Sequence, residues 1–496
     1  MSAGDHASPC AVRPAVAGAD ASLDAAALEL RVARLASALR EAEPRPRVLG
    51  LAADNGPDWL ITDLACERIG LPIVPLPAFF AAGQMQHAVD TSGMDALLCA
   101  APSAAQALGF APAGRLPGVS LPWFRRSARP TALPAGTSKI TFTSGTTGQP
   151  RGVCLSSAHQ RRVAGSLVHA TRDLGIERHL SLLPLAVLLE NIAGVYAPLM
   201  AGATCCVPPL SDVGVGGSSS FDPFTCLNAI AQWQAHSVIV LPQMLLALSA
   251  ALEAGAPRPS HLRFVAVGGA KVAPALIARA RAVGLPAYEG YGLSECGSVV
   301  ALNVPGADRA GSVGRPLPHV RVSVDASREL VVHGSAFLGY LGGPANDDDA
   351  LHTGDLGRVE ADGFLIVDGR RKHQLITAFG RNVAPEWPEA ELAASPLIAQ
   401  AAVFGEAKPR LCAVIVPRAQ GADDAAVDAA VASANLRLPD YAQVARWVRA
   451  DAPFCAADGT ATANGRVLRD AVWSRYAERL ESTYQDPNGV VIDALL

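Results

Sequence analysis

Residues 138–152 read Ser-Lys-Ile-Thr-Phe-Thr-Ser-Gly-Thr-Thr-Gly-Gln-Pro-Arg-Gly, a short strand-like run followed by a loop rich in glycine and hydroxyl side chains. Backbone N–H groups and hydroxyls in such a loop can bind an anion, and glycine permits the positive φ and close approach that a phosphate cradle needs. The loop is not a Walker loop, because Gly145 and Gly148 are too close together and no lysine follows. The stretch therefore predicts a nucleotide-phosphate loop that follows a strand.

Short apolar runs alternate with helix-like segments on both sides of this loop. Strands separated by helices favour βαβ units and parallel sheets covered on both faces, and near-continuous apolar strands are typical of the same arrangement. Past residue 310 the pattern changes to three β-like runs, at 320–324, 329–332 and 364–367. The strands expected before that point lie at 48–52, 73–76, 96–99, 140–143, 181–183, 204–207, 237–241 and 264–267.

With 496 residues, the chain is too long for one ordinary hydrophobic core. We expect an α/β fold with a large N-terminal domain over residues 22–369, made of doubly wound parallel sheets and a small β-rich subdomain. A small mobile α+β C-terminal domain over 373–496 is expected to follow, with the charged segment 370–372 as the hinge. Residues 1–21 are expected to be a disordered lead, and Ser22 to be the N-cap of the first helix.

The composition excludes several classes of protein. A net charge of −4 and a pI near 6.3 give no electrostatic preference for nucleic acid. The ten cysteines form no CxxC or CxxH pattern, which indicates reduced thiols and a cytoplasmic location rather than a zinc site or a disulfide framework. The most apolar stretch, 182–210, is interrupted by Glu190, Asn191 and several prolines. No transmembrane segment is therefore expected, and peripheral membrane contact is left open.

Four stretches, in this order along the chain, resemble motifs of the adenylate-forming acyl-CoA synthetases, adenylation domains and luciferases. The loop at 143–152 matches that family's Thr-Ser-Gly-Thr-Thr-Gly-x-Pro-Lys-Gly, with Arg151 in place of the lysine. The segment Tyr-Glu-Gly-Tyr-Gly-Leu-Ser-Glu at 288–295 resembles Tyr-Gly-x-Thr-Glu, and Thr-Gly-Asp at 353–355 resembles the ribose-binding motif. Asp-Gly-Arg-Arg-Lys at 368–372 resembles the hinge. Weaker matches lie at 311–316 and 380–386, and the resemblance runs from about residue 23 to about residue 476.

The resemblance implies an AMP-forming acid–thiol ligase that binds ATP, and it implies roles for individual residues. Glu295 stands at the magnesium position, and Ser294 keeps the hydroxyl that would meet the α-phosphate. Tyr291 would stack near the adenine, and Asp355 and Arg370 would bind the ribose. The implied β,γ-phosphate loop consists of Thr143, Ser144, Gly145, Thr146, Thr147 and Gly148. The other residues of the implied nucleotide site are Gly269, Glu289, Gly290 and Gly292.

One departure from the family pattern concerns the acyl site. Val187 follows Pro-Leu-Ala at 184–186, where family members usually carry a histidine two residues after Pro-Leu. An aliphatic side chain there suggests an apolar acyl pocket without a polar gate, although Val187 fits a plain core position equally well. In amino-acid-activating relatives an aspartate near the position of Leu189 holds the substrate's α-amino group, so an amino-acid substrate is disfavoured.

A second departure is Arg466. In the family a Gly-Lys near the C-terminus supplies an ammonium that bridges the attacking carboxylate and the α-phosphate, whereas this chain has Gly465-Arg466 and no lysine after Lys408. The chain contains four lysines and thirty-seven arginines, so the exchange follows a preference of the whole chain. We interpret Arg466 as a working catalytic substitute, although a planar guanidinium has different directional demands from an ammonium. Altered or weak adenylation is the alternative.

The expected reaction joins a carboxylic acid to ATP with Mg²⁺, releases pyrophosphate and passes the acyl group to a thiol. The expected thiol is coenzyme A or the phosphopantetheine arm of an acyl carrier protein. A medium- or long-chain fatty acid or another apolar acid is favoured as substrate, with aryl and polyene acids left open. Two alternatives stay open as well: adenylation that feeds a step without a thiol, and a catalytically silent relative that binds nucleotide or acyl chains.

Overall fold

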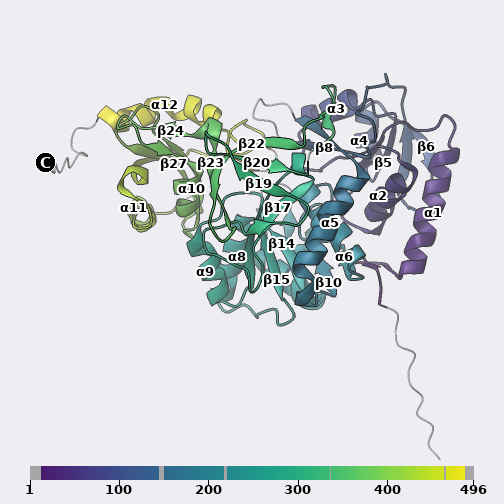
Figure 1. Ribbon diagram of the computed structural model, residues 1–496, viewed down its shortest axis with the longest axis horizontal. Coiled ribbons are helices and arrows are strands. Elements are labelled where there is room, and N and C mark those ends of the chain that lie inside the picture. The colour runs from purple at the N-terminus through teal and green to yellow at the C-terminus, as the bar shows by residue number, and fades with distance from the viewer. Residues whose placement is uncertain are drawn as a thin grey trace, which may run out of the picture.

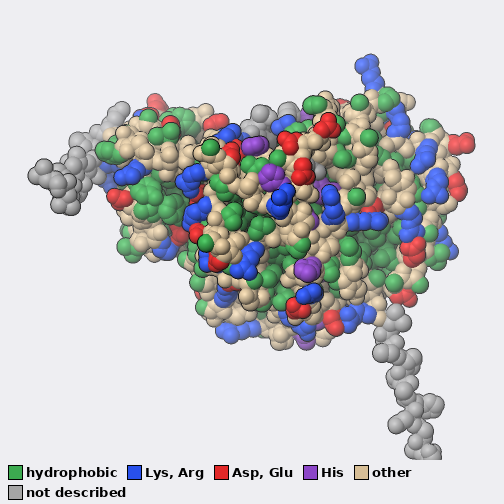
Figure 2. Space-filling view, viewed as in Figure 1, with side chains coloured by type: hydrophobic (Ala, Val, Ile, Leu, Met, Phe, Trp, Pro, Cys, Tyr) green, Lys and Arg blue, Asp and Glu red, His purple; other side chains and the backbone are tan. Residues whose placement is uncertain are grey.

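The computed structural model describes residues 13–143, 150–216, 220–335, 337–419, 421–462 and 465–485. Two large sheets with helices packed on them form the main body, and a smaller lobe at one end contains the C-terminal elements (Figure 1). In these ranges no helix is long and apolar enough to cross a membrane. On the face in Figure 2, acidic and basic side chains are interspersed and form no single-sign stripe.

The first large sheet has the strand order β21-β9-β8-β4-β3-β5-β7-β6. Its central strands β8, β4, β3 and β5 are parallel, and the strands added at both edges are antiparallel. The bounds are β3 Leu49–Ala52, β4 Ile73–Pro75, β5 Ala96–Cys99, β6 Ala111–Arg115, β7 Pro122–Arg125, β8 Lys139–Thr143, β9 Arg151–Leu155 and β21 Gly339–Tyr340. Its helices are α1 Ala25–Glu41, α2 Pro57–Ile69, α3 Ala82–Thr91 and α4 Pro102–Ala107.

The second large sheet has the order β18-β17-β16-β15-β14-β10-β11-β1-β2, with a parallel core from β16 to β1. Its strands are β1 Val16–Ala17, β2 Ser22–Leu23, β10 Arg178–Leu180, β11 Thr204–Cys206, β14 Ser237–Val240, β15 Phe264–Val267, β16 Ala287–Leu293, β17 Ser298–Leu302 and β18 Arg315–Pro316. The helices of this region are α5 Ser157–Thr171, α6 Ala197–Met200, α7 Pro223–Gln232, α8 Pro242–Glu253 and α9 Pro274–Ala282. A π-helix, η2 (Glu190–Tyr196), precedes α6, and β12 (Val215–Gly216) pairs with β13 (Ser220–Phe221).

The small β-rich subdomain is an antiparallel sheet of order β19-β20-β22-β23. Its strands are β19 Arg321–Val324, β20 Glu329–His333, β22 Ala350–Val359 and β23 Leu365–Arg370. The C-terminal lobe is α+β and has hydrophobic clusters of its own, formed by residues between 375 and 484. Its elements are β24 Leu375–Ile376, β25 Asn382–Val383, α10 Glu386–Ala393, β26 Ile398–Phe404, β27 Leu411–Pro417, α11 Asp424–Asn435, β28 Val444–Arg449 and α12 Arg469–Gln485.

Three local expectations are wrong. Residues 16 and 17 do not belong to a disordered lead, because they form β1, which pairs in parallel with β11 and buries Val16 completely. Residues 1–12 lie outside the described part of the chain. The first helix is capped by Asp24, whose Oδ1 accepts from the Ala27 N–H at 2.7 Å, and Ser22 lies in β2 instead.

The strand expected at 181–183 is in fact β10, Arg178–Leu180, three residues earlier. The sequence signal failed because the strand carries two polar residues, Arg178 and His179, whereas apolar residues dominate after it. His179 can occupy a buried strand position because its ring nitrogens have partners from distant segments, as described below.

Candidate active site

A cavity of about 540 Å³ lies between the second large sheet and the helices α5, η2 and α6. The walls of the cavity are largely apolar. The second large sheet and the loops after its strands contribute residues 237–239, 264, 266–269 and 290–294 to the lining. The predicted residues Gly269, Gly290, Tyr291, Gly292 and Ser294 line it together with Val187 and Leu189. The structure thus joins part of the predicted nucleotide site and the predicted acyl site in one cavity.

Parallel strands explain why these residues meet. β15 ends at Val267, directly before Gly268 and Gly269, and it pairs in parallel with β16, which carries residues 290–293. In open α/β sheets, ligands bind outside the carboxyl ends of the strands, where the loops of neighbouring strands lie close together. Gly269 has φ +85°, in the left-handed region that glycine adopts without strain.

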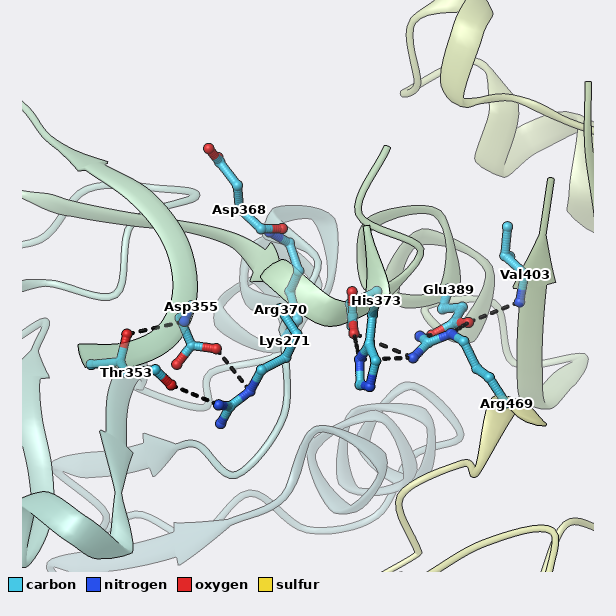
Figure 3. A network of polar contacts seen from close by, with 10 residues as sticks. Lys271, Thr353, Asp355, Asp368, Arg370, His373, Glu389, Val403 and Arg469 are labelled. Carbon is cyan, nitrogen blue, oxygen red and sulfur yellow. Dashed lines mark hydrogen bonds and ion pairs between the residues drawn. The ribbon is translucent and has the colours of Figure 1, made fainter. Parts of the chain in front are cut away.

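The predicted ribose residues Asp355 and Arg370 form one partly buried cluster with Tyr291. Arg370 Nε lies 2.8 Å from Asp355 Oδ1, and the Tyr291 hydroxyl donates to Asp355 Oδ2 at 2.5 Å. Arg370 also donates to the Thr353 carbonyl at 2.9 Å (Figure 3). Burial raises the pKa of Asp355, whereas the charge of Arg370 and the Tyr291 hydrogen bond act to lower it. Each carboxylate oxygen keeps acceptor capacity for a sugar hydroxyl, because an ionised carboxylate offers about four lone-pair sites.

Glu295 is connected through Tyr340 to Arg151, which follows the predicted phosphate loop. The Tyr340 hydroxyl donates to Glu295 Oε1 at 2.8 Å, and the Arg151 guanidinium stacks over the Tyr340 ring at 3.6 Å from its centroid. Thr143 Oγ1 donates to the Arg151 carbonyl at 3.4 Å, which links the ends of the loop. The predicted loop residues Ser144, Gly145, Thr146, Thr147 and Gly148 lie outside the described residues.

Tyr340 is a site residue that the sequence analysis missed. Burial and the neighbouring Glu295 carboxylate raise the pKa of Tyr340 to about 12, so its hydroxyl stays protonated and can donate. Tyr340 reaches the site through β21, which pairs with β9 across more than 180 residues of sequence. No local pattern in the sequence signals such a pairing.

Lys271 was also missed, and it connects the predicted nucleotide edge to β23, the strand before the predicted hinge. Its Nζ donates to the carbonyls of Val367 and Asp368, at 2.7 and 3.1 Å. The predicted Glu289 lies beside Lys271, and its side chain is not among the described lining of the cavity. Burial raises the pKa of Glu289 to about 8, an effect that the Lys271 charge opposes.

The segment after Arg370 runs directly into a polar network of the C-terminal lobe. His373 Nδ1 lies 2.6 Å from Glu386 Oε1, which also pairs with Arg469 at 3.3 Å. Arg469 forms a second ion pair with Glu389, whose Oε1 accepts from the Val403 N–H at 2.8 Å (Figure 3). Burial opposes ionisation of Glu386, but the His373 hydrogen bond and the Arg469 charge hold its pKa well below the usual range.

Two hydrogen bonds join Arg466 to Thr462 in this lobe. The Thr462 N–H donates to the Arg466 carbonyl at 2.7 Å, and the Arg466 N–H donates to Thr462 Oγ1 at 3.1 Å. Arg370, Asp355 and Glu386 are among the charged groups that act electrostatically on its guanidinium. The structure therefore brings the charge of Arg466 to the side of the ribose cluster.

Comparison with known proteins identifies the family. The family described as "AMP-binding enzyme" matches residues 5–341, and "AMP-binding enzyme C-terminal domain" matches residues 372–488. The chain is 28% identical to the long-chain-fatty-acid–CoA ligase FadD15 of Mycobacterium bovis, over 94% of this chain and 92% of the relative. It is 32% identical to a feruloyl-CoA synthase of an Amycolatopsis species, over 80% of this chain and 84% of the relative.

A solved structure is also similar to this chain over most of its length. The amide bond synthetase McbA from Marinactinospora thermotolerans is 26% identical and has a TM-score of 0.74, with 94% of this chain and 97% of that chain covered. The first family match lies in the main body, and the second covers most of the C-terminal lobe. The chain therefore belongs to the AMP-binding enzymes and is an adenylate-forming ligase of the acyl-CoA synthetase type.

Proposed function

We propose that the protein activates an apolar carboxylic acid with ATP and Mg²⁺ and transfers the acyl group to a thiol. The main observation in support is the largely apolar cavity. One edge of this cavity is formed by Gly269 and residues 290–294, beside the ion pair of Asp355 and Arg370. An apolar wall favours an alkyl or aryl group, because burial of apolar surface stabilises the complex and unpaired polar groups would be costly there. A medium- or long-chain fatty acid or another apolar acyl acid is the proposed substrate.

In the first step a carboxylate oxygen of the acid attacks the α-phosphorus of ATP. The bond between the α-phosphorus and the bridging oxygen breaks, which gives acyl-adenylate and pyrophosphate. Asp355 and Arg370 hold the ribose, and the hydroxyl of Ser294 contacts the α-phosphate. Mg²⁺, when bound, offsets phosphate charge, and the Glu295 carboxylate is the hard oxygen ligand that suits it.

Arg466 supplies positive charge to this step in the proposed mechanism. A guanidinium can donate to a carboxylate and to a phosphate oxygen at once, which holds the two reacting groups together and offsets the charge that develops. Its location beside the charges of Asp355 and Arg370 supports this role.

In the second step a thiol sulfur attacks the acyl carbonyl and AMP leaves with its phosphate oxygen. We propose that the lobe after residue 372 rotates about residues 370–372 to exchange Arg466 for the thiol. Separate hydrophobic clusters in the C-terminal lobe support movement as a unit. The proposed thiol is coenzyme A or the phosphopantetheine arm of a carrier protein.

The relatives have names that agree with an apolar acid: a long-chain fatty acid for FadD15 and a feruloyl group for the feruloyl-CoA synthase. Val187 and Leu189 line the cavity of this chain and supply no polar partner for an α-amino group. The cysteines of the described ranges are free, which fits the reducing cytosol that we propose as the location.

Acid-dependent exchange of labelled pyrophosphate into ATP tests the proposal. A panel of fatty acids, aryl acids and amino acids should show exchange with apolar acids and none with amino acids. Addition of coenzyme A or of a phosphopantetheinylated carrier protein should then convert the acyl-adenylate to a thioester. Exchange without any thioester would favour a non-thiol acceptor, such as the amine that the name of the amide bond synthetase suggests for that neighbour. No exchange with any acid would reject the proposal in favour of a catalytically silent protein.

A further inference from the structure

Three buried polar side chains form a hydrogen-bonded chain in the wall of the apolar cavity. His179 Nε2 lies 2.9 Å from Glu190 Oε1, and His179 Nδ1 lies 2.9 Å from Ser237 Oγ. The exposed fractions are 0% for Glu190, 2% for His179 and 4% for Ser237. Polar groups in an apolar interior are costly unless they are paired, so this chain is a specific construction within a largely apolar site.

The donor and acceptor roles follow from the chemistry of the three groups. A carboxylate only accepts hydrogen bonds, so His179 Nε2 donates to Glu190. When the imidazole is neutral, Nδ1 accepts from the Ser237 hydroxyl; when the ring is protonated, Nδ1 donates to the Ser237 oxygen. In both cases the Ser237 oxygen keeps a lone pair that can accept a hydrogen bond. Ser237 therefore offers a hydrogen-bond acceptor to a group inside the cavity.

Both His179 and Ser237 line the cavity, far from its nucleotide edge. They lie opposite each other on the parallel strands β10 and β14, and Ser237 is paired with Phe264 of β15. Gly268 follows Phe264 by four residues, which corresponds to about 13 Å along a strand. The acceptor oxygen is therefore placed where the far end of an acyl group would lie when its carboxylate is at the nucleotide edge.

Other polar side chains at this end of the cavity already have partners. Arg13 pairs with Glu177 at 2.8 Å, and both side chains are about half exposed. The hydroxyl of Thr171 donates to the Leu167 carbonyl at 2.8 Å, within its own helix. Arg172 is also exposed and lies 3.7 Å from Asp173. Ser237 is thus the buried polar contact that the distal cavity offers.

Gly194 leaves space in the helix η2 for the contact between His179 and Glu190. A Cβ atom at Gly194 would lie 2.7 Å from His179 Nε2 and would overlap the Glu190 carboxylate. The residue belongs to the π-helix η2, a type of helix that is rare and often occurs at functional sites. The glycine allows the Glu190 carboxylate to fold back onto His179, which fixes the ring that orients the Ser237 hydroxyl.

We propose that Ser237, oriented by His179 and Glu190, accepts a hydrogen bond from a hydroxyl at the far end of the acyl group. The preferred substrates are then apolar carboxylic acids with a hydroxyl roughly 10–13 Å from the carboxylate, as the strand spacing requires. This inference rests on the proposed function, because it concerns the acid that the site activates. Ser237 is a specificity-determining residue in it, and His179 and Glu190 are positioning residues.

Matched pairs of acids test the proposal: 10-hydroxydecanoic against decanoic acid, and 8-hydroxyoctanoic against octanoic acid. The readout is the ratio of kcat/KM for pyrophosphate release, hydroxy acid over parent acid. The wild-type ratio should be about ten for at least one pair, as expected for one buried hydrogen bond. Ser237→Ala should lower this ratio to one or below while activity on the parent acid persists. Ser237→Thr keeps a hydroxyl and should therefore keep the wild-type ratio.

A buried serine outside the cavity provides the control. Ser249 is fully buried in α8 and donates to the Leu245 carbonyl at 2.7 Å, so Ser249→Ala should leave the ratio unchanged. A wild-type ratio of one or less for both pairs would overturn the inference, and so would an unchanged ratio in Ser237→Ala. In both cases activity on the parent acids would leave the proposed function standing. If the wild type activates no acid at all, the proposed function and this inference fail together.

Discussion

Replacement of Gly369 by alanine adds a single carbon atom to the contact between the two lobes. Gly369 is buried at the end of β23, and a Cβ there would lie 3.0 Å from Glu386 Oε2 and would overlap the Ala384 side chain. Both of those residues belong to the C-terminal lobe. The backbone of Gly369 is outside the positive-φ region, so alanine adds bulk without backbone strain.

The size of the effect follows from the crowding. Extra atoms in a well-packed contact cost roughly 1–3 kcal/mol. If rotation of the C-terminal lobe separates the two lobes, the added carbon raises the free energy of the arrangement seen here. The free energy of the rotated arrangement stays unchanged, because the contact is absent from it. The ratio of the two arrangements then shifts by about 5- to 150-fold, because about 1.4 kcal/mol corresponds to a factor of ten.

Two single-turnover assays measure this shift. The arrangement seen here places the Arg466 charge beside Asp355, which is the arrangement that we assign to adenylation. Gly369→Ala should therefore slow adenylate formation by up to the same factor. Conversion of preformed acyl-adenylate to thioester should be unchanged or faster.

A control variant separates this effect from general destabilisation. Gly421 also lies in the C-terminal lobe, and a Cβ there would meet nothing within 4 Å, so Gly421→Ala should change neither half-reaction. Equal slowing of both half-reactions by Gly369→Ala, or a fall in melting temperature without a change in their ratio, would refute the proposed rotation.

Three further predictions concern individual side chains. Arg466→Ala should slow adenylate formation by about tenfold or more while thioester formation from acyl-adenylate persists, and Arg466→Lys should keep the rate; a normal rate for the alanine variant would reject the bridging role. Glu295→Gln should weaken Mg²⁺-dependent adenylation without lowering the melting temperature, whereas a collapsed melting temperature would show a structural role. Burial raises the pKa of Glu289 to about 8, so the folded protein holds this proton more tightly than the unfolded chain does. The free energy of unfolding should therefore fall as pH rises from about 4.5 to about 8. Glu289→Gln should flatten that part of the stability-against-pH curve, and an unchanged slope in chemical denaturation would contradict the assignment.

Much of the site could be predicted because its motifs are local in sequence. Gly269 and residues 290–294 are contributed by the ends of neighbouring parallel strands, so correct strand order brings them together. The pair of Asp355 and Arg370 likewise follows from antiparallel pairing of β22 with β23, where the two residues are direct partners. Short-range sequence patterns are sufficient to predict site residues when these residues lie on neighbouring strands.

The residues that were missed depend on long-range pairing. Tyr340 reaches Glu295 only because β21 adds to the edge of β9, and Lys271 acts through backbone carbonyls that no side-chain pattern reveals. His179 misled the strand assignment because a buried histidine is tolerated only with partners, here Ser237 and Glu190, that the local sequence does not show. Val16 was assigned to a disordered lead for the same reason, since its burial requires the distant strand β11.

Transfer of oxygen from the acid to AMP tests the central proposal of carboxylate activation most directly. If a carboxylate oxygen attacks the α-phosphorus, an acid labelled with ¹⁸O in its carboxyl group forms an acyl-adenylate with a labelled bridging oxygen. When the thiol displaces AMP from this acyl-adenylate, one labelled oxygen stays on AMP. Mass spectrometry of AMP from a complete reaction with ATP, Mg²⁺, an apolar acid and coenzyme A should show AMP with one ¹⁸O atom, in amounts equal to the thioester. Unlabelled AMP, or ADP as the nucleotide product, would contradict the account.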